Sequence, residues 1–144
     1  MIYLIFLISI FIHELSHIVV GFLLGYKLKK IGMLPVGFYI EFETSYNIVF
    51  IKKIIILLSG PISNFCISLF FYKFNTYFSE KIFLINIFLG IFNLLPIYPL
   101  DGENILNQSI QIFCGYKKGN NKSFIVSKCC LCCITFLYSL LILL

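Results

Sequence analysis

The sequence predicts an all-α polytopic membrane protein with about four transmembrane helices and a small membrane-surface β-hairpin after the first helix. Two observations carry this prediction. Of the 144 residues, 60% are hydrophobic and 12% are charged, whereas soluble domains contain about 45–50% apolar and about 25% charged residues. The apolar residues also gather into runs of roughly 20, the length that crosses a bilayer. This composition excludes a disordered chain and a water-soluble globule.

Four apolar stretches are expected to span the membrane within a single domain that covers residues 1–144. The stretches are approximately residues 2–24, 54–72, 82–100 and 124–144. The first has no basic residues before it and is too long for the apolar core of a signal peptide, so we interpret it as a retained helix. Pro96 and Pro99 lie late in the third stretch and are expected to break its helix, because proline lacks the backbone N–H donor.

The lysines predict how these helices are oriented. Nine of the eleven lie between the first and second stretches, between the third and fourth, or at the start of the fourth, whereas Lys73 and Lys81 separate the second from the third. Basic residues concentrate on the cytoplasmic side of membrane proteins. Both long connections should therefore be cytoplasmic and both termini outside. Because the lysines anchor helix ends, no nucleic-acid partner is expected.

Residues 34–51 have the pattern of strands. Phe38, Ile40 and Phe42 alternate with more polar neighbours, and a turn-like segment at residues 44–47 precedes a second apolar run. The alternation predicts a small β-hairpin at the membrane surface, and the alternative is a plain amphipathic connection.

The first stretch also contains the motif His13-Glu14-Leu15-Ser16-His17. Residues i and i+4 share one face of a helix, so both imidazoles can bind one metal ion, and Glu14 can take a proton from a water that the metal activates. Zn²⁺ suits this set because it accepts imidazole nitrogen and lowers the pKa of bound water toward about 7. A purely structural role is disfavoured, because each charged group at the centre of a membrane helix costs about 2.5–3.5 kcal/mol.

Asp101 is the expected third ligand. On a straight third helix it would lie near the membrane surface, whereas the histidines are expected about 10–16 Å below that surface. Pro96 and Pro99 let the chain fold back inward, which is tolerated where the backbone is buried or lines a wet cavity. The alternative for Asp101 is a carboxylate at a helix end, exposed at the interface.

Three segments resemble the signatures of the site-2 protease family of intramembrane zinc metalloproteases. They are His13–His17, Ser59–Asn64 and Asn93–Gly102, in the order found in the family. The last segment, together with residues 34–37, is most similar to the sporulation branch, stage IV sporulation protein FB.

The resemblance implies roles for individual residues. One Zn²⁺ per chain would be held by His13, His17 and Asp101, and Glu14 would be the general base. Asn93 would contact the substrate. Gly37 would also do so, as part of a strand that helps hold an unwound substrate.

The expected function is that of a zinc endopeptidase that cleaves a membrane-associated protein near the cytoplasmic face. The resemblance implies a pro-sigma factor or another tethered transcription-factor precursor as substrate, a possible membrane regulatory partner, and a location in a bacterial cell or sporulation membrane. The competing class is a catalytically inactive scaffold or metal-binding component that binds clients without cleaving them.

Four cysteines near the C-terminus suggest a second metal site, which geometry disfavours. The cluster is Cys129, Cys130, Cys132 and Cys133. On a helix these positions cover too wide an arc for four thiolates to share one ion, so we interpret them as small residues packed in a membrane helix. Residues 104–113 are expected to form a short interfacial helix.

Overall fold

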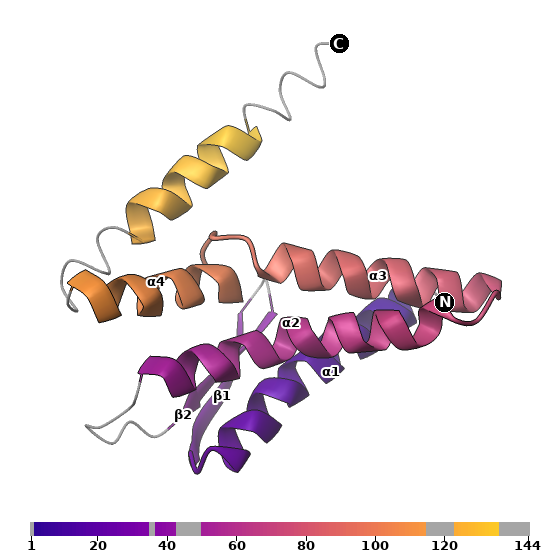
Figure 1. Ribbon diagram of the computed structural model, residues 1–144, viewed down its shortest axis with the longest axis horizontal. Coiled ribbons are helices and arrows are strands. Elements are labelled where there is room, and N and C mark those ends of the chain that lie inside the picture. Colours follow the sequence, from indigo (N-terminus) through magenta and orange to yellow (C-terminus); the bar gives the residue numbers. More distant parts are fainter. Residues whose placement is uncertain (1, 35–36, 43–49, 115–122, 136–144) are drawn as a thin grey trace. The chain divides into compact units, whose positions relative to one another are not determined.

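A computed structural model of the chain describes residues 2–34, 37–42, 50–114 and 123–135. Along the chain the elements are α1 (Ile2–Leu23), β1 (Leu28–Leu34), β2 (Gly37–Phe42), α2 (Phe50–Tyr72), α3 (Tyr77–Asn93) and α4 (Asp101–Cys114) (Figure 1). A further short apolar helix covers Ser123–Thr135. The chain divides into two compact units, Met1–Asn93 and Leu94–Leu144, and each is described by itself.

In the first unit, α2 packs against both α1 and α3, and α1 also contacts α3. The first two helices run antiparallel, because His17 in the later part of α1 meets Ile56 early in α2, and His13 meets Asn64 further along. This arrangement brings the motif of α1 against the signature segment of α2.

The helices α2 and α3 form an antiparallel pair that begins at a capped turn. The Thr76 side chain accepts the Ser79 backbone N–H at 3.2 Å, and the Ser79 hydroxyl accepts the Thr76 N–H at 3.1 Å. This reciprocal cap satisfies N–H groups that a helix start leaves unpaired. It explains why α3 begins at Tyr77, five residues before the predicted span of 82–100.

The third predicted span also ends earlier than expected. We predicted a helix to about residue 100, but α3 stops at Asn93 and α4 begins at Asp101. Between them, turn hydrogen bonds join the N–H groups of Ile97 and Leu100 to carbonyls two or three residues earlier. The prolines interrupt the helix, as predicted. The interruption begins two residues before Pro96, because a residue that precedes proline is disfavoured in helical conformation.

A two-stranded antiparallel sheet follows α1. Leu34 pairs with Gly37 at one end and Leu28 with Phe42 at the other, with an irregularity in the register between Leu28 and Lys30. The sheet also contacts α1 through β2.

The strands are placed differently from the predicted hairpin of residues 34–51. The first strand of the predicted hairpin corresponds to β2. However, β2 pairs with β1, which precedes it in the chain, and not with a later strand. The predicted turn at 44–47 lies outside the described residues. Phe50 and Ile51, expected in a second strand, begin α2, because on a helix they lie four residues before Ile54 and Ile55 and extend the same apolar faces.

Among the described helices, α1 and α2 are long and apolar enough to cross a membrane. The helix α3 has 17 residues, or about 25 Å at 1.5 Å per residue. In the predicted fourth span of 124–144, the described part is the helix Ser123–Thr135, and residues 136–144 lie outside the description. Four membrane spans therefore remain a prediction.

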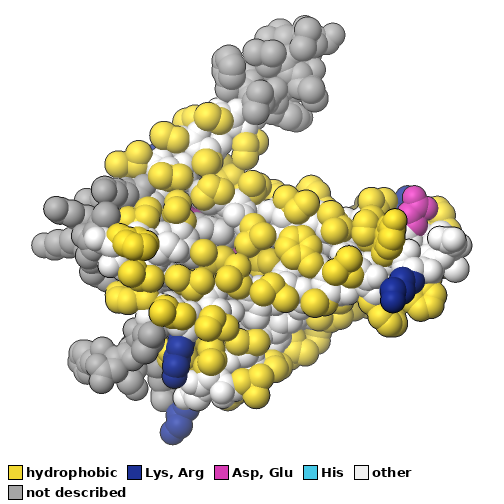
Figure 2. Space-filling model, viewed as in Figure 1, with side chains coloured by type: hydrophobic (Ala, Val, Ile, Leu, Met, Phe, Trp, Pro, Cys, Tyr) yellow, Lys and Arg dark blue, Asp and Glu magenta, His cyan; other side chains and the backbone are white. Residues whose placement is uncertain are grey.

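The described helices have a polar interior and an apolar exterior. The buried hydrophobic side chains are Ile56 and Leu89, whereas the buried polar or charged ones are Ser9, His13, His17, Asn64, Ser68, Ser79, Asn86, Glu103, Gln111, Ser123 and Ser127. Hydrophobic side chains cover most of the face seen in Figure 2. Small and polar residues between helices, with large apolar residues outside, are typical of helices surrounded by lipid.

In the second unit, the start of α4 packs closely against the chain that precedes it. A side chain at Gly102 would overlap the Leu94 carbonyl. The Tyr98 backbone N–H donates a hydrogen bond of 2.9 Å to the Ser127 hydroxyl. These contacts hold the segment before α4 against the described C-terminal helix. The interfacial helix predicted at residues 104–113 lies within α4.

Candidate metal centre

The two histidines lie on the buried face of α1. The buried residues of this helix follow one another at intervals of four: Ser9, His13, His17 and Gly21. Residues at this spacing lie above one another on one face. The residues between them are half-buried or exposed, so the two histidines point into the first unit.

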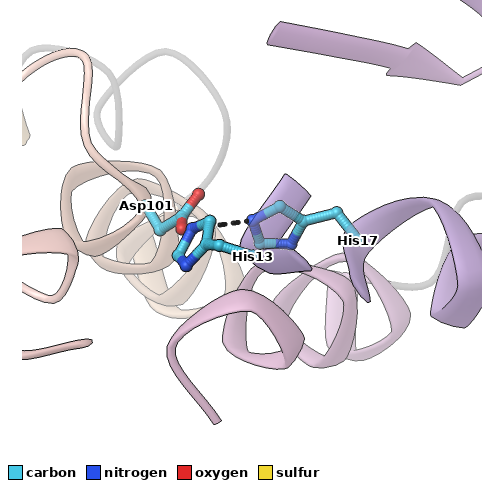
Figure 3. Close-up of side chains that lie close together, drawn as sticks. All are labelled: His13, His17 and Asp101. Atoms are coloured by element: carbon cyan, nitrogen blue, oxygen red, sulfur yellow. Dashed lines mark hydrogen bonds between the residues drawn. The ribbon is translucent and has the colours of Figure 1, made fainter. Parts of the chain in front are cut away.

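The imidazoles of His13 and His17 present the same nitrogen to each other. Their Nε2 atoms are 3.3 Å apart and the rings meet edge to face (Figure 3). The side chains are 4% and 6% exposed. Two zinc–nitrogen bonds of about 2.0–2.1 Å at a tetrahedral angle place the nitrogens about 3.3–3.4 Å apart. The pair therefore has the spacing of two ligands of one ion.

The second ring nitrogen of His17 is held by α2. Its Nδ1 lies 2.8 Å from the Ile56 carbonyl and 3.3 Å from the Ser59 hydroxyl. A carbonyl can only accept, so Nδ1 carries the proton and Nε2 keeps its lone pair. Such outer partners commonly fix the tautomer of metal-binding histidines.

The second ring nitrogen of His13 also contacts α2. The Asn64 amide Nδ2 lies 3.2 Å from Nδ1 of His13. Asn64 is fully buried, and its Oδ1 has no hydrogen-bond partner among the described residues.

Gly60 leaves room beside the two imidazoles. A Cβ at this position would be 2.5 Å from Nε2 of His17 and 2.6 Å from Nε2 of His13. Any larger residue would fill the space next to the two nitrogens that a metal would use. Two imidazole nitrogens at ligand spacing beside such a space fit a zinc ion.

Two carboxylates complete the predicted set. Glu14 is half-buried next to His13 on α1, and Asp101 is half-buried as the first residue of α4, in the second unit. The histidines belong to the first unit and Asp101 to the second, so a metal ion shared by these three side chains, which are drawn in Figure 3, stays a prediction. Two histidines and a carboxylate are a common ligand set of catalytic zinc.

The predicted substrate-binding residues lie outside this group. Asn93 is the last residue of α3, and its amide donates to the Leu89 carbonyl at 3.1 Å. Gly37 is the first residue of β2. A substrate role for either stays a prediction.

The cysteines of the C-terminal helix belong to no metal-binding group in the described part of the chain. Cys129, Cys132 and Cys133 are exposed and carry free thiols, as does the half-buried Cys130.

The sequence profile of Peptidase family M50 matches residues 1–80 and 75–137. The chain belongs to this family, the site-2 proteases. Membership supports a metalloprotease of the membrane. The predicted family resemblance is thereby confirmed.

Individual family members are similar over most of this chain. A zinc metalloprotease of Methanocaldococcus jannaschii is 30% identical over 93% of this chain and 41% of its own length. Stage IV sporulation protein FB of Bacillus subtilis is 26% identical over 69% of this chain and 37% of its own length. The chain thus spans about two fifths of these relatives.

A solved structure shares the fold. The site-2 protease from Methanocaldococcus jannaschii superimposes with a TM-score of 0.74 and 28% identity, over 98% of this chain and 68% of that chain.

The sequence interpretation did not anticipate the contacts that α2 makes with the histidines. It identified Ser59–Asn64 as a family signature but gave no partner to Asn64. One signal was available: Gly60 and Asn64 are four residues apart, as are the histidines, and polar residues in an apolar span usually face another helix.

Proposed function

We propose that this chain is an intramembrane zinc endopeptidase that cleaves a membrane-associated protein near the cytoplasmic face. The observation that carries the proposal is the buried pair of imidazoles, with Nε2 atoms 3.3 Å apart. The pair lies in a helix that is long and apolar enough to cross a membrane. Family M50 membership supports the same activity.

In this proposal His13, His17 and Asp101 hold one Zn²⁺. When bound, the ion supplies Lewis acidity and lowers the pKa of water toward about 7. Glu14 takes the proton of the attacking water and then passes it to the leaving amine. The low exposure of the imidazoles limits bulk water around these groups.

A substrate helix must unwind before cleavage, because its peptide bonds are hydrogen-bonded within the helix. Among the described residues β1 and β2 pair only with each other, so each strand leaves an outer edge with which an extended chain could pair. We propose that the sheet edge near Gly37 holds the substrate and that Asn93 contacts it.

The cytoplasmic position follows from the lysines at the ends of α2. Lys52 lies in its first turn and Lys73 directly after its end, so about 31 Å of helix separates them. His17 contacts Ile56, only one turn from Lys52. If basic residues mark the cytoplasmic side, the site lies in the cytoplasmic half of the membrane.

The substrate proposal rests on the sporulation relative. Similarity to stage IV sporulation protein FB, at 26% identity, favours a pro-sigma factor or another tethered transcription-factor precursor. We also propose a membrane regulatory partner, which such a protease would need in order to cleave at a defined time.

Replacement of the general base tests the proposed activity. The chain and its Glu14→Gln variant are each co-expressed with a panel of reporters that have one membrane segment and a cytoplasmic tag, including a pro-sigma-type precursor. We expect release of a tagged fragment with the original chain and its loss, by about 10²-fold or more, with the variant. Both proteins should retain zinc.

A matched control replaces Leu15, an exposed neighbour of Glu14, with Ala and should leave cleavage unchanged. Cleavage that survives Glu14→Gln would contradict the role of Glu14. Zinc binding and reporter capture without cleavage by the original chain would favour the inactive scaffold.

A further inference from the structure

The contacts of His13 and His17 with α2 differ in one respect that matters for metal binding. The partner of His17 is the Ile56 carbonyl, at 2.8 Å, which places the proton on Nδ1 and the lone pair on Nε2. The partner of His13 is the Asn64 amide nitrogen, at 3.2 Å. A donor at this position makes Nδ1 of His13 an acceptor and leaves the ring proton on Nε2.

With that proton, His13 can donate to Nε2 of His17 across the 3.3 Å that separates them, but it cannot bind zinc through Nε2. A metal-binding His13 needs an acceptor opposite Nδ1. The Asn64 amide can provide one if it turns by 180°, because its oxygen and nitrogen occupy nearly the same positions.

The amide has the freedom to turn. Its oxygen is buried and has no hydrogen-bond partner among the described residues, so no bond at that atom holds the present orientation. The oxygen of Asn86 on α3 also has no partner among the described residues, but the bonds of its amide nitrogen hold its orientation. Asn86 is equally buried, and its amide nitrogen donates to both the Ser9 hydroxyl and the Ile82 carbonyl.

We propose that Asn64 is a positioning residue for the metal: its amide oxygen accepts the Nδ1 proton of His13 and frees Nε2 to bind. One helix, α2, then sets the tautomer of both imidazole ligands, through the Ile56 carbonyl and the Asn64 side chain. This inference rests on the proposed zinc site and adds a residue outside the ligand set.

Metal affinity of Asn64 variants tests the proposal without any substrate. Purified chains in detergent are titrated with Co²⁺, monitored by its visible absorption, and with Zn²⁺ in competition. Asn64→Leu should weaken binding by about 10–100-fold, the usual effect of losing an outer partner. Asn64→Asp should stay within a few-fold of the original chain, because a carboxylate accepts from Nδ1.

Asn86→Leu is the matched control, since it removes an equally buried amide that contacts α1 through Ser9. Its metal affinity should be unchanged. The proposal is overturned if Asn64→Asp weakens binding as much as Asn64→Leu, or if Asn64→Leu binds like Asn86→Leu. An original chain that binds no metal would instead contradict the zinc site itself.

Nitrogen-15 NMR of the zinc-loaded original chain gives an answer that does not depend on how the variants fold. The sequence has two histidines, so two ring systems appear in a long-range spectrum. We expect both rings to carry a proton on Nδ1. A zinc-loaded ring that carries its proton on Nε2 and contacts Asn64 would overturn the proposal.

Discussion

Gly60 determines how closely α2 can approach the two imidazoles. Its missing side chain leaves a space in which a Cβ would be 2.5 and 2.6 Å from the two Nε2 atoms. Real Cβ atoms do not approach so closely, so a side chain at this position must displace the imidazoles or α2. The absence of a side chain at Gly60 therefore preserves the spacing of the two imidazoles.

We expect Gly60→Ala to weaken zinc binding by at least 10-fold, because the added methyl group displaces nitrogens that must be about 2.0–2.1 Å from the ion. Competition with a zinc-binding dye measures the affinity. The control is Ile62→Ala on the same helix, where the side chain is 52% exposed and affinity should not change. Equal affinities for Gly60→Ala and the original chain would contradict this packing.

Polar contacts join the helices of the first unit. Asn86 of α3 donates to the Ser9 hydroxyl of α1 at 3.1 Å, on the face that also carries the histidines. Side-chain hydrogen bonds between membrane helices average about 0.6 kcal/mol. This contact therefore adds modest stability to the packing of α1 against α3.

A double-mutant cycle with Ser9→Ala and Asn86→Leu should yield a coupling energy of about 0.6 kcal/mol. Unfolding in mixed detergent, followed by circular dichroism, measures the four stabilities. Strictly additive effects of the two substitutions would show that the contact contributes nothing.

The start of α4 depends on Gly102. Because a Cβ there would overlap the Leu94 carbonyl, Gly102→Ala should lower the free energy of unfolding by about 1–3 kcal/mol, as overpacking does. Thermal unfolding in detergent measures the change. Ser109→Ala is the control on the same helix, since this hydroxyl bonds within α4 to Ile105, and it should change stability by less than about 0.5 kcal/mol. Equal melting temperatures for Gly102→Ala and the control would contradict the close packing.

The elements differ in how far they could be predicted. The apolar runs and the spacing of His13 and His17 identified α1 and α2, since both signals depend on local sequence. The strand β1 was missed because its lysines were interpreted only as anchors of the first span. The contact of Asn64 with His13 was beyond prediction, because it depends on the rotation and register of two packed helices.

At the scale of the molecule, the two long described helices have the surface of lipid-exposed helices. Only 22% of the apolar window of α1 and 28% of that of α2 are buried, and large hydrophobic side chains form the exposed faces of both helices (Figure 2). A core helix of a soluble protein would be mostly buried. Membership of a membrane protease family accounts for this surface.

The lysine distribution predicts which side faces the cytoplasm. An amine-reactive label that does not cross membranes should modify Lys73 and Lys81 in intact cells and Lys52 and Lys53 in inverted vesicles, as quantified by mass spectrometry. The reason is the enrichment of basic residues on the cytoplasmic side. The opposite labelling pattern would reverse the proposed topology and place the site in the outer half of the membrane.

The metal content of the purified chain is the most direct test of the zinc centre. We predict about one zinc per folded chain by mass spectrometry of the metal, a tetrahedral ligand set with two imidazoles by X-ray absorption, and loss of most of this zinc in His13→Ala, His17→Ala and Asp101→Ala. Leu15→Ala should keep it. A folded original chain without zinc after zinc-supplemented purification, or zinc that survives all three ligand substitutions, would contradict the account.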